Sequence, residues 1–315
     1  MNKLFFNKIK KMNKKENNIM SFQIMTDTSS GMPKSLREKY HIDYYQMGIV
    51  VNEKEYLANL DYEEFSREEM YGWVKDPNIK VRTSLVSNQE FVTKTEKYLK
   101  KGMDILYIAC SSALSGTRSV FELTKQELME KYPDRKIVSI DSCRAEMALG
   151  LLVVDAAKLR DEGKSFDEVA KWVEEHKQYY HETGSIDTLK YLKAYGRVSG
   201  AAAFFADTFN IKPIIMFDVN GCNYTFKKVH GEKKALSECF NYIKDNITEE
   251  TDVIYIGETM PNPAKEYFRK RINEELHIPT EEYIISPIVG ICCGPGMYGC
   301  WFKGKLVTAD SKNEK

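Results

Sequence analysis

Short apolar runs alternate with longer amphipathic segments through the first 180 residues. Strand-like apolar runs occupy residues 22–25, 47–51, 104–109 and 136–140. Helix-like segments are expected at residues 66–75, 87–101, 115–130, 145–159 and 165–180. Three of these helices open with a Ser-x-x-Glu capping box, at Ser66, Ser87 and Ser165. Alternation of this kind predicts βαβ units and a mostly parallel sheet.

The pattern changes from about residue 183. Two strands flanking an Asn-Gly turn, at 214–217 and 224–228, predict a hairpin. Helices are expected at 187–194, 201–209, 231–244 and 262–275, with a strand at 252–256. A final strand pair is expected to start at 283–285, to be interrupted by 290–296 and to continue at Trp301 and Phe302. We expect domains at 20–180 and 181–308, followed by a polar tail at 309–315.

The first 19 residues differ from the rest, with six lysines, one acid and a small apolar cluster at 4–6. They lack the apolar stretch and cleavage site of a secretion signal. This basic extension, which we expect to be disordered, is either an arm that touches an anionic surface or an extension of a protein that starts at Met20. We favour the second interpretation because a compact domain begins at Ser21.

Composition narrows the function classes. In 315 residues, 46 basic side chains balance 46 acidic ones, so no overall charge recruits nucleic acid or a membrane surface. No apolar run reaches the ~18 residues of a membrane helix, so we expect no integral membrane segment. The seven cysteines form no CxxC pair, which favours a reduced, cytoplasmic protein. The spacing of Cys292, Cys293 and Cys300 fits no usual zinc site, so we expect buried thiols and no metal.

Hydroxyl-bearing loops follow three of the predicted strands. Residues 110–117 (CSSALSGT) follow one strand, 26–31 (TDTSSG) another, and Asp141-Ser142 a third. Parallel strands with right-handed crossovers place these ends on one edge of the sheet, where unpaired N–H groups of the next helix attract anions. Ser115 by itself could be no more than a helix N-cap. The convergence of three loops favours a site that holds a carboxylate or phosphate through neutral donors.

Catalytic signatures are absent from the sequence. GxGxxG, the Walker A loop, HExxH and GxSxG do not occur, and the five histidines fall in helical or linker contexts. Asp27 is as suited to orienting its hydroxyl loop as to acting on a substrate. We therefore assign no catalytic residue and favour binding over turnover.

The ordered motifs resemble the DegV family, from about residue 22 to 303. They are TDTSS at 26–30 with Pro33, Thr83-Ser84, SxLSGT at 112–117, Asp141-Ser142, GRVS at 196–199, IKP at 211–213 and GPG at 294–296. The resemblance implies a two-domain α/β protein with a mostly parallel N-terminal sheet and a mixed-sheet C-terminal domain. It also implies one long-chain fatty acid enclosed between the domains, with no other cofactor.

The family pattern assigns the fatty-acid carboxylate to Thr83 and to either Ser112 or Ser115, and we favour Ser112 by its loop position. Cys292 stands where the family often has a head-group histidine. A thiol is a weaker donor, which shifts the head group toward Thr83 and Ser112. The family motifs also contribute supporting loop residues, which are Asp27, Ser29, Ser84, Gly116, Thr117, Gly294 and Gly296.

Family members act as carriers, and several hand the acid to a fatty acid kinase that makes acyl phosphate for phospholipid synthesis. Arg197 could attract the ligand's charge, dock the partner or form a surface salt bridge. His230 replaces a family arginine linked to kinase docking. The apolar stretches 201–209, 214–217 and 284–291 could line an acyl tunnel or simply form core. Two alternatives stay open: an enzyme for a small phosphorylated or carboxylated metabolite, and an interaction protein with an empty pocket.

Overall fold

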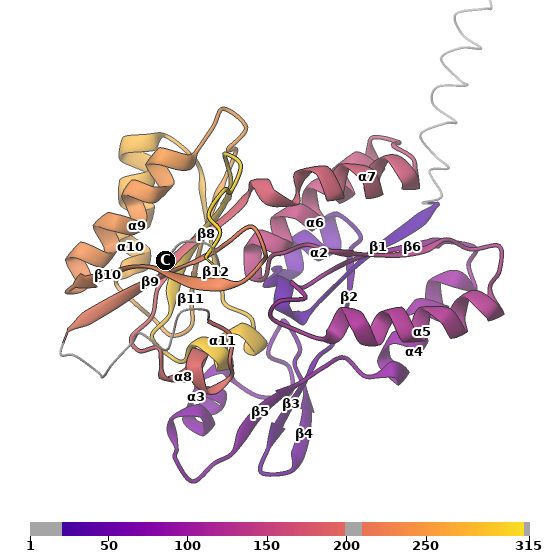
Figure 1. Ribbon diagram of the computed structural model, residues 1–315, viewed down its shortest axis with the longest axis horizontal. Helices are drawn as coiled ribbons and strands as arrows, with labels where there is room; N and C mark the ends of the chain where they lie inside the picture. Colours follow the sequence, from indigo (N-terminus) through magenta and orange to yellow (C-terminus); the bar gives the residue numbers. More distant parts are fainter. Residues whose placement is uncertain (1–20, 199–209, 312–315) are drawn as a thin grey trace, which may run out of the picture.

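The N-terminal half is built on a parallel four-stranded sheet (Figure 1). The computed structural model describes residues 21–198 and 210–311. The sheet has the order β2-β1-β6-β7 and contains β1 (Phe22–Asp27), β2 (Asp43–Tyr45), β6 (Asp104–Ala109) and β7 (Ile137–Asp141). Alternate strand residues face two core clusters. One face packs on α6 (Glu146–Asp161) and α7 (Phe166–His176), and the other on α4 (Asn88–Leu99) and α5 (Thr117–Lys131). The predicted parallel sheet is confirmed, except that the strand expected at 47–51 belongs to a separate antiparallel sheet.

A small antiparallel sheet lies beside it, with the order β4-β3-β5. Its strands are β3 (Gly48–Val51), β4 (Lys54–Leu57) and β5 (Val81–Ser84), and α3 (Arg67–Lys75) lies in the connection between β4 and β5. The sequence pattern predicts no strand at Thr83 and Ser84, yet both lie in β5, where Thr83 pairs with Ile49. The strand is four residues long, too short for its alternation to be recognised as a strand.

The C-terminal half contains a mixed six-stranded sheet with the order β10-β9-β8-β13-β11-β12. Its strands are β8 (Tyr180–Ser185), β9 (Ile211–Phe217), β10 (Asn223–His230), β11 (Ile254–Glu258), β12 (Thr280–Ile284) and β13 (Tyr298–Lys303). The β11–β12 pair is parallel and the other pairs are antiparallel. Helix α9 (Glu232–Asn246), α10 (Ala264–Arg271) and the π-helical turn Ile272–Leu276 cover one face. The predicted hairpin forms as β9 and β10.

The predicted final strand pair is wrong. Strand β12 pairs with β11, whereas β13 lies between β8 and β11. Between them runs α11 (Pro287–Cys293), a short helix with proline in its first turn. Proline suits that position because its missing N–H has no helical partner to lose. The apolar run of this segment is too short for periodicity to separate helix from strand.

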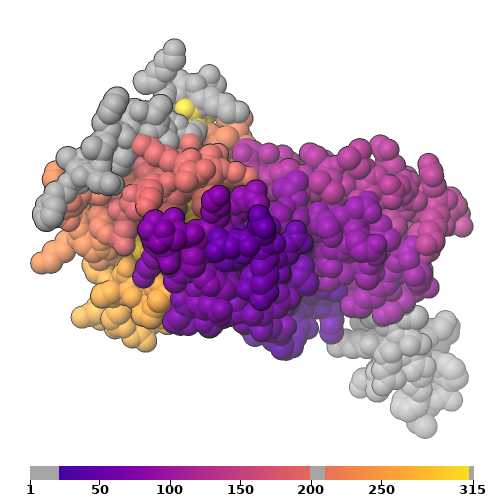
Figure 2. Space-filling model, turned by 90° about the horizontal axis from the view of Figure 1, so that it is seen from below, coloured from indigo at the N-terminus to yellow at the C-terminus, as the bar shows by residue number. Residues whose placement is uncertain are grey.

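Helix α6 lies between the two large sheets (Figure 1). Twelve of its residues are buried, and its core cluster extends to Trp301 in the C-terminal sheet, so its predicted burial is confirmed. Figure 2 shows the purple N-terminal half and the orange and yellow C-terminal half packed directly together. We propose 20–180 and 181–308 as the domains, since β8 begins the second sheet. The expected extension at 1–19 and helix at 201–209 lie outside the described residues.

The start of the predicted tail is attached to the C-terminal half. The Val219 amide donates to the Ala309 carbonyl (2.9 Å), and the Ser311 hydroxyl donates to the Asp218 carboxylate (2.6 Å). Residues 309–311 therefore pack on the turn of the β9–β10 hairpin. The remaining elements are α2 (Lys34–Lys39), α8 (Lys190–Ala194) and the short turns Thr28–Ser30 and Lys177–Tyr179.

Candidate functional site

Asp27, at the end of β1, organises the loops at the sheet edge. Its carboxylate is fully buried and accepts hydrogen bonds from the Ser29 amide (3.0 Å) and hydroxyl (2.5 Å). It also accepts from the Tyr107 hydroxyl (2.7 Å) and the Cys110 amide (3.0 Å). These four donors occupy both oxygens and join the loops after β1 and β6. Asp27 therefore orients the hydroxyl loops and does not face the cavity described below.

Within the loop after β6, the two candidate serines face different surroundings. Ser115 is buried; its hydroxyl accepts from the Thr117 amide (3.3 Å) and donates to the Thr117 hydroxyl (3.0 Å). Gly116 is the N-cap residue of α5. Ser112 is exposed, and its amide donates to the Asp141 carboxylate (3.2 Å). The hydroxyl of Ser115 thus contributes to the start of α5 while lying at the edge of the sheet.

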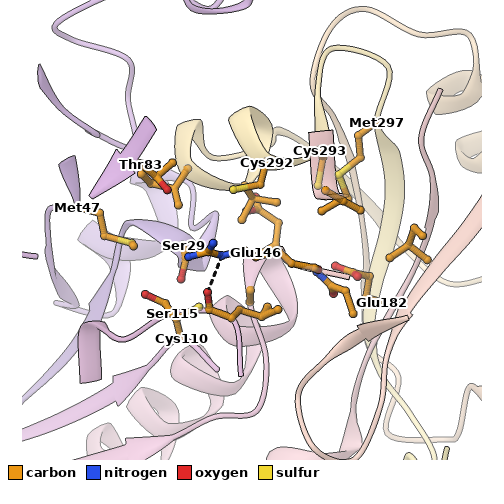
Figure 3. A pocket seen from close by; sticks show the side chains of 18 of the residues that line it. Ser29, Met47, Thr83, Cys110, Ser115, Glu146, Glu182, Cys292, Cys293 and Met297 are labelled. Carbon is orange, nitrogen blue, oxygen red and sulfur yellow. Dashed lines mark hydrogen bonds between the residues drawn. The ribbon is translucent and has the colours of Figure 1, made fainter. Parts of the chain in front are cut away.

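A cavity of about 390 Å³ lies where these loops meet α11, β8 and β9 (Figure 3). We call it the central cavity. Its polar lining residues are Ser29, Thr83, Ser84, Ser115, Glu146, Glu182, Arg197 and Asn223. The other lining residues are Met47, Leu85, Cys110, Leu114, Ala145, Ile186, Leu192, Ile215, Phe217, Ile288, Val289, Cys292, Cys293 and Met297. The volume and the mainly apolar lining are typical of small-molecule pockets.

The structure brings together residues that are far apart in the sequence. Thr83 from β5, Ser115 from the loop after β6 and Cys292 from α11 all line the central cavity. In Figure 3, Thr83 and Ser115 lie on the side of the N-terminal half, with Cys292 between them and the C-terminal sheet. Ser112 is not among the lining residues, although the loop position favoured it. The residues that bring hydroxyl groups to the lining of the cavity are Ser29, Thr83, Ser84 and Ser115.

Arg197 places a positive charge at the end of the central cavity that Ser115 lines. Its side chain is half-buried, and its Nε donates to the Leu114 carbonyl, in the loop that carries Ser115 (3.0 Å). Across residues 21–198 and 210–311, no carboxylate forms an ion pair with this guanidinium. The sequence left three roles for Arg197, and this position favours attraction of a ligand's charge over a surface salt bridge.

The two adjacent thiols of α11 are protonated at neutral pH. Burial raises the pKa of the Cys292 thiol to about 11, although the Arg197 charge opposes this shift. Burial likewise raises the pKa of Cys293 well above its ordinary value. Protonated thiols are weak donors and poor nucleophiles, so they contribute polarisable, mainly apolar surface.

The Gly-Pro-Gly segment after α11 permits close packing. A β-carbon on Gly294, where φ is +82°, would lie 2.2 Å from the Tyr191 ring. One on Gly296 would lie 1.9 Å from the Asp187 carboxylate. Both glycines therefore let α11 and its exit loop lie against the α8 region. His230, at the end of edge strand β10, is exposed and does not line the central cavity.

Sequence reasoning missed two buried carboxyl groups of the central cavity, Glu146 and Glu182. Burial raises the pKa of each to about 8. Glu146 begins α6 and accepts from both the amide (3.0 Å) and the hydroxyl (2.6 Å) of Ser286. Glu182, in β8, accepts from the indole N–H of Trp301 (3.0 Å). The available sequence signal for Glu182 was its place between Tyr180 and Gly184 on one face of a strand. That pattern does not predict that the carboxyl group is buried.

The fold and the central cavity define the class: an α/β protein with a parallel and a mixed sheet and a mainly apolar pocket between them. The chain belongs to the DegV family, described as an uncharacterised protein family, whose sequence pattern it matches over residues 21–304. A DegV domain-containing protein of Clostridium perfringens is 33% identical over 287 residues, which cover 90% of this chain and 97% of the relative. A second one from that organism is 33% identical over 278 residues.

Solved structures share this fold. A DegV family protein from Thermus thermophilus, described by its fatty acid binding, superposes with a TM-score of 0.80. That protein is 24% identical, and the match covers 91% of this chain and all of the other. A stearic acid-binding protein from Eubacterium ventriosum gives a TM-score of 0.79 at 20% identity, covering 90% of this chain and 98% of the other. At these identities the likeness establishes the fold.

Among the helices in 21–198 and 210–311, none has the length and apolar character needed to cross a bilayer. In the same residues no cluster of three or more His, Cys, Asp or Glu side chains could hold a metal ion.

Proposed function

We propose that this protein binds one long-chain fatty acid in the central cavity and acts as a carrier for it. One observation carries the proposal: the central cavity combines four hydroxyl groups and Arg197 with a mainly apolar lining. Neutral donors beside a positive charge suit a carboxylate. Each buried methylene of an acyl chain contributes about 0.8 kcal/mol. The apolar lining therefore supplies affinity, and the polar end supplies orientation.

We further propose that Thr83 and Ser115 hold the carboxylate, with Cys292 nearby. Both line the central cavity, whereas the Ser112 side chain is exposed outside it. Ser112, which its loop position in the sequence favours, is not among the lining residues, so Ser115 takes its place in the proposal. The described relatives that bind fatty acids, from Thermus thermophilus and Eubacterium ventriosum, support a ligand of this chemistry.

Extraction of the purified protein tests the proposal. Denaturation and organic extraction of protein made in a bacterial host, followed by mass spectrometry, should release about one equivalent of a saturated or monounsaturated fatty acid. A protein that yields no lipid, and that binds none when titrated with stearic or oleic acid, would overturn it.

The proposal extends to a kinase partner, with the bound acid presented for acyl-phosphate synthesis. It rests on the resemblance of the motifs, with Arg197 and the exposed His230 as candidate contacts. A fatty acid kinase subunit with ATP should convert the bound acid to acyl phosphate, trapped by hydroxylamine as a hydroxamate. We also propose a reducing, cytoplasmic location, in keeping with seven free thiols.

The alternative, an enzyme for a small metabolite, is less well supported. A small phosphorylated substrate would need more polar surface than this cavity offers. The third hypothesis, an interaction protein with an empty pocket, predicts that substitution of Thr83 and Ser115 changes no ligand binding. If phosphate competed with a fatty acid for the central cavity, that result would support the enzyme hypothesis.

A further inference from the structure

Glu182 is a buried acid that lines the central cavity. It lies in β8 opposite Trp301 of β13, and 5% of its surface is exposed. Its Oε2 accepts from the Trp301 indole N–H at 3.0 Å. Its Oε1 has no hydrogen-bond partner in residues 21–198 and 210–311, and the side chain lines the cavity. Half of this carboxyl group is thus left without a structural role.

The other cavity acid, Glu146, is fully used by the fold. Its Oε1 accepts from the Ser286 amide and its Oε2 from the Ser286 hydroxyl. A β-carbon on Gly31 would lie 2.1 Å from its Oε1, so the backbone after β1 is also packed against it. Glu146 joins the start of α6 to the loop before α11. Comparison of the two acids identifies Glu182 as the one with an available oxygen.

The protonation state of Glu182 makes that oxygen a donor. Burial and the nearby Glu146 raise the pKa of Glu182 to about 8, although the Trp301 hydrogen bond and the Arg144 charge oppose the shift. At neutral pH the carboxyl group is mainly protonated. With Oε2 accepting from Trp301, the proton on Oε1 can be donated into the cavity, and Oε1 can also accept.

Glu182 is remote from the hydroxyl end of the cavity. Figure 3 shows Thr83 and Ser115 on the side of the N-terminal half, and Glu182 on the opposite side, toward the C-terminal sheet. Apolar residues, among them Ile186, Ile215 and Phe217, line the cavity as well. An acyl chain held by its carboxylate at Thr83 would reach Glu182 only with carbons well along its length.

We propose that the preferred ligand is a long-chain fatty acid that carries a hydroxyl group along its chain, hydrogen-bonded by Glu182. This inference rests on the proposed function. A hydroxyl matches a protonated carboxyl because each group both donates and accepts. A plain methylene chain leaves the buried donor unpaired, which costs affinity. Glu182 would thus determine which acyl chains bind most tightly, whereas the carboxylate of every chain would bind in the same way.

A positional series tests the proposal. Delipidated full-length protein would be titrated with stearic acid and with eighteen-carbon acids that carry one hydroxyl at successive positions. We expect one position, or two adjacent ones, to bind about tenfold more tightly than stearic acid, with weaker binding elsewhere. Equal or weaker binding of every hydroxylated acid would overturn the inference.

Two variants assign the effect to Glu182. Glu182→Leu removes the donor, and the hydroxyl preference should disappear while stearic acid binds at least as well. Glu182→Gln retains an acceptor for Trp301 and an N–H donor for the ligand, so most of the preference should remain. A hydroxyl preference that persists in a folded Glu182→Leu protein would contradict the proposal. If the Glu182→Leu protein does not fold, the positional series is measured with the wild-type protein and with Glu182→Gln, and that series decides.

The outcomes separate this inference from the proposed function. If stearic acid binds but no hydroxyl position improves binding, the carrier function stands and the role of Glu182 is refuted. If neither plain nor hydroxylated acids bind, both proposals fail.

Discussion

Ser115 combines two roles at the scale of single residues. Its hydroxyl supports the first turn of α5 through Thr117 and also lines the central cavity. The interpretation of Ser115 as the helix N-cap was wrong, because Gly116 is the N-cap of α5, and the hydroxyl of Ser115 bonds to Thr117 from one residue further out. Ser112, three residues earlier, is exposed and held through its amide by Asp141. The two serines make a matched pair for testing which hydroxyl meets the ligand.

We expect Ser115→Ala and Thr83→Ala each to weaken fatty-acid binding by about 1.5–3 kcal/mol, the usual value of a hydrogen bond to a charged group. Ser112→Ala should leave the dissociation constant unchanged. Calorimetric titration with oleic acid measures all three, and thermal unfolding checks that each variant is folded. Loss of affinity in Ser112→Ala but not in Ser115→Ala would return the assignment to Ser112.

The buried acids predict a pH-dependent stability. The pKa of Glu182 is about 8 in the folded protein against an ordinary value of 4.5, so between these values the folded state holds a proton that the unfolded chain has released. Stability contributed by this proton is complete below pH 4.5 and is lost as the pH rises through 8. The loss is about 1.4 kcal/mol per pH unit within that window.

Urea unfolding between pH 5.5 and 8.5 measures this effect. The free energy of unfolding of Glu182→Gln should decline less steeply with pH than that of the wild-type protein, because one such proton is missing. Glu146 is present in both proteins, so part of the decline remains in the variant. Parallel curves would show that Glu182 is ionised throughout.

At the scale of elements, α11 connects the two halves of the central cavity. It contacts α3 and α8, and it contributes Ile288, Val289, Cys292 and Cys293 to the lining. Its close approach to α3 depends on Gly290, because a β-carbon there would lie 2.2 Å from the Tyr71 hydroxyl. Tyr71 is fully buried, so it has little room to move.

We therefore expect Gly290→Ala to lower the free energy of unfolding by about 1–3 kcal/mol through overpacking, and to weaken ligand binding by displacing α11. Gly72→Ala in α3 is the control, since its β-carbon would meet nothing within 4 Å. That change should stabilise the helix by up to about 1 kcal/mol. Chemical unfolding measures both variants. Equal effects would mean that α11 tolerates a shift away from Tyr71.

At the scale of the whole molecule, the central cavity lies between the two halves, so a bound acyl chain contacts both. Residues of the N-terminal loops and of β8, β9 and α11 all line it. Ligand binding to the folded state stabilises that state, by about 2.7 kcal/mol when the free ligand is at 100 times its dissociation constant.

A series of saturated fatty acids should therefore raise the melting temperature of delipidated protein progressively. At about 0.8 kcal/mol per methylene, each added carbon should tighten binding about fourfold until the cavity is filled, after which affinity should level off. Acetate at the same concentration, which has the head group without the chain, should give almost no shift. Equal shifts for acetate and stearate would contradict a chain-driven affinity.

Much of the fold was predictable from local patterns. Ser-x-x-Glu motifs marked α3, α4 and α7. In all three helices the serine hydroxyl accepts from the glutamate amide, and in α7 the glutamate side chain also bonds back to complete the capping box. The Asn-Gly turn marked the β9–β10 hairpin. Strands β2, β4 and β5 and helix α11 were missed because segments of three to seven residues carry too little periodicity. Strand β8 was missed because its sequence, YHETGS, is largely polar although all six residues are buried. Of the site, Thr83, Ser115 and Cys292 were identified from motifs, whereas Glu146 and Glu182 were not.

The sequence by itself determined the longer helices, the parallel strands 22–25, 104–109 and 136–140, the hydroxyl loops at their ends and the membership of the family. These features depend on residues close together in the chain, whose spacing can be read directly. The tertiary structure decided that Ser115 rather than Ser112 lines the cavity and that Glu182 is buried beside Trp301. Burial and pKa depend on contacts between residues as distant as these two, 119 positions apart, and no local pattern records such contacts.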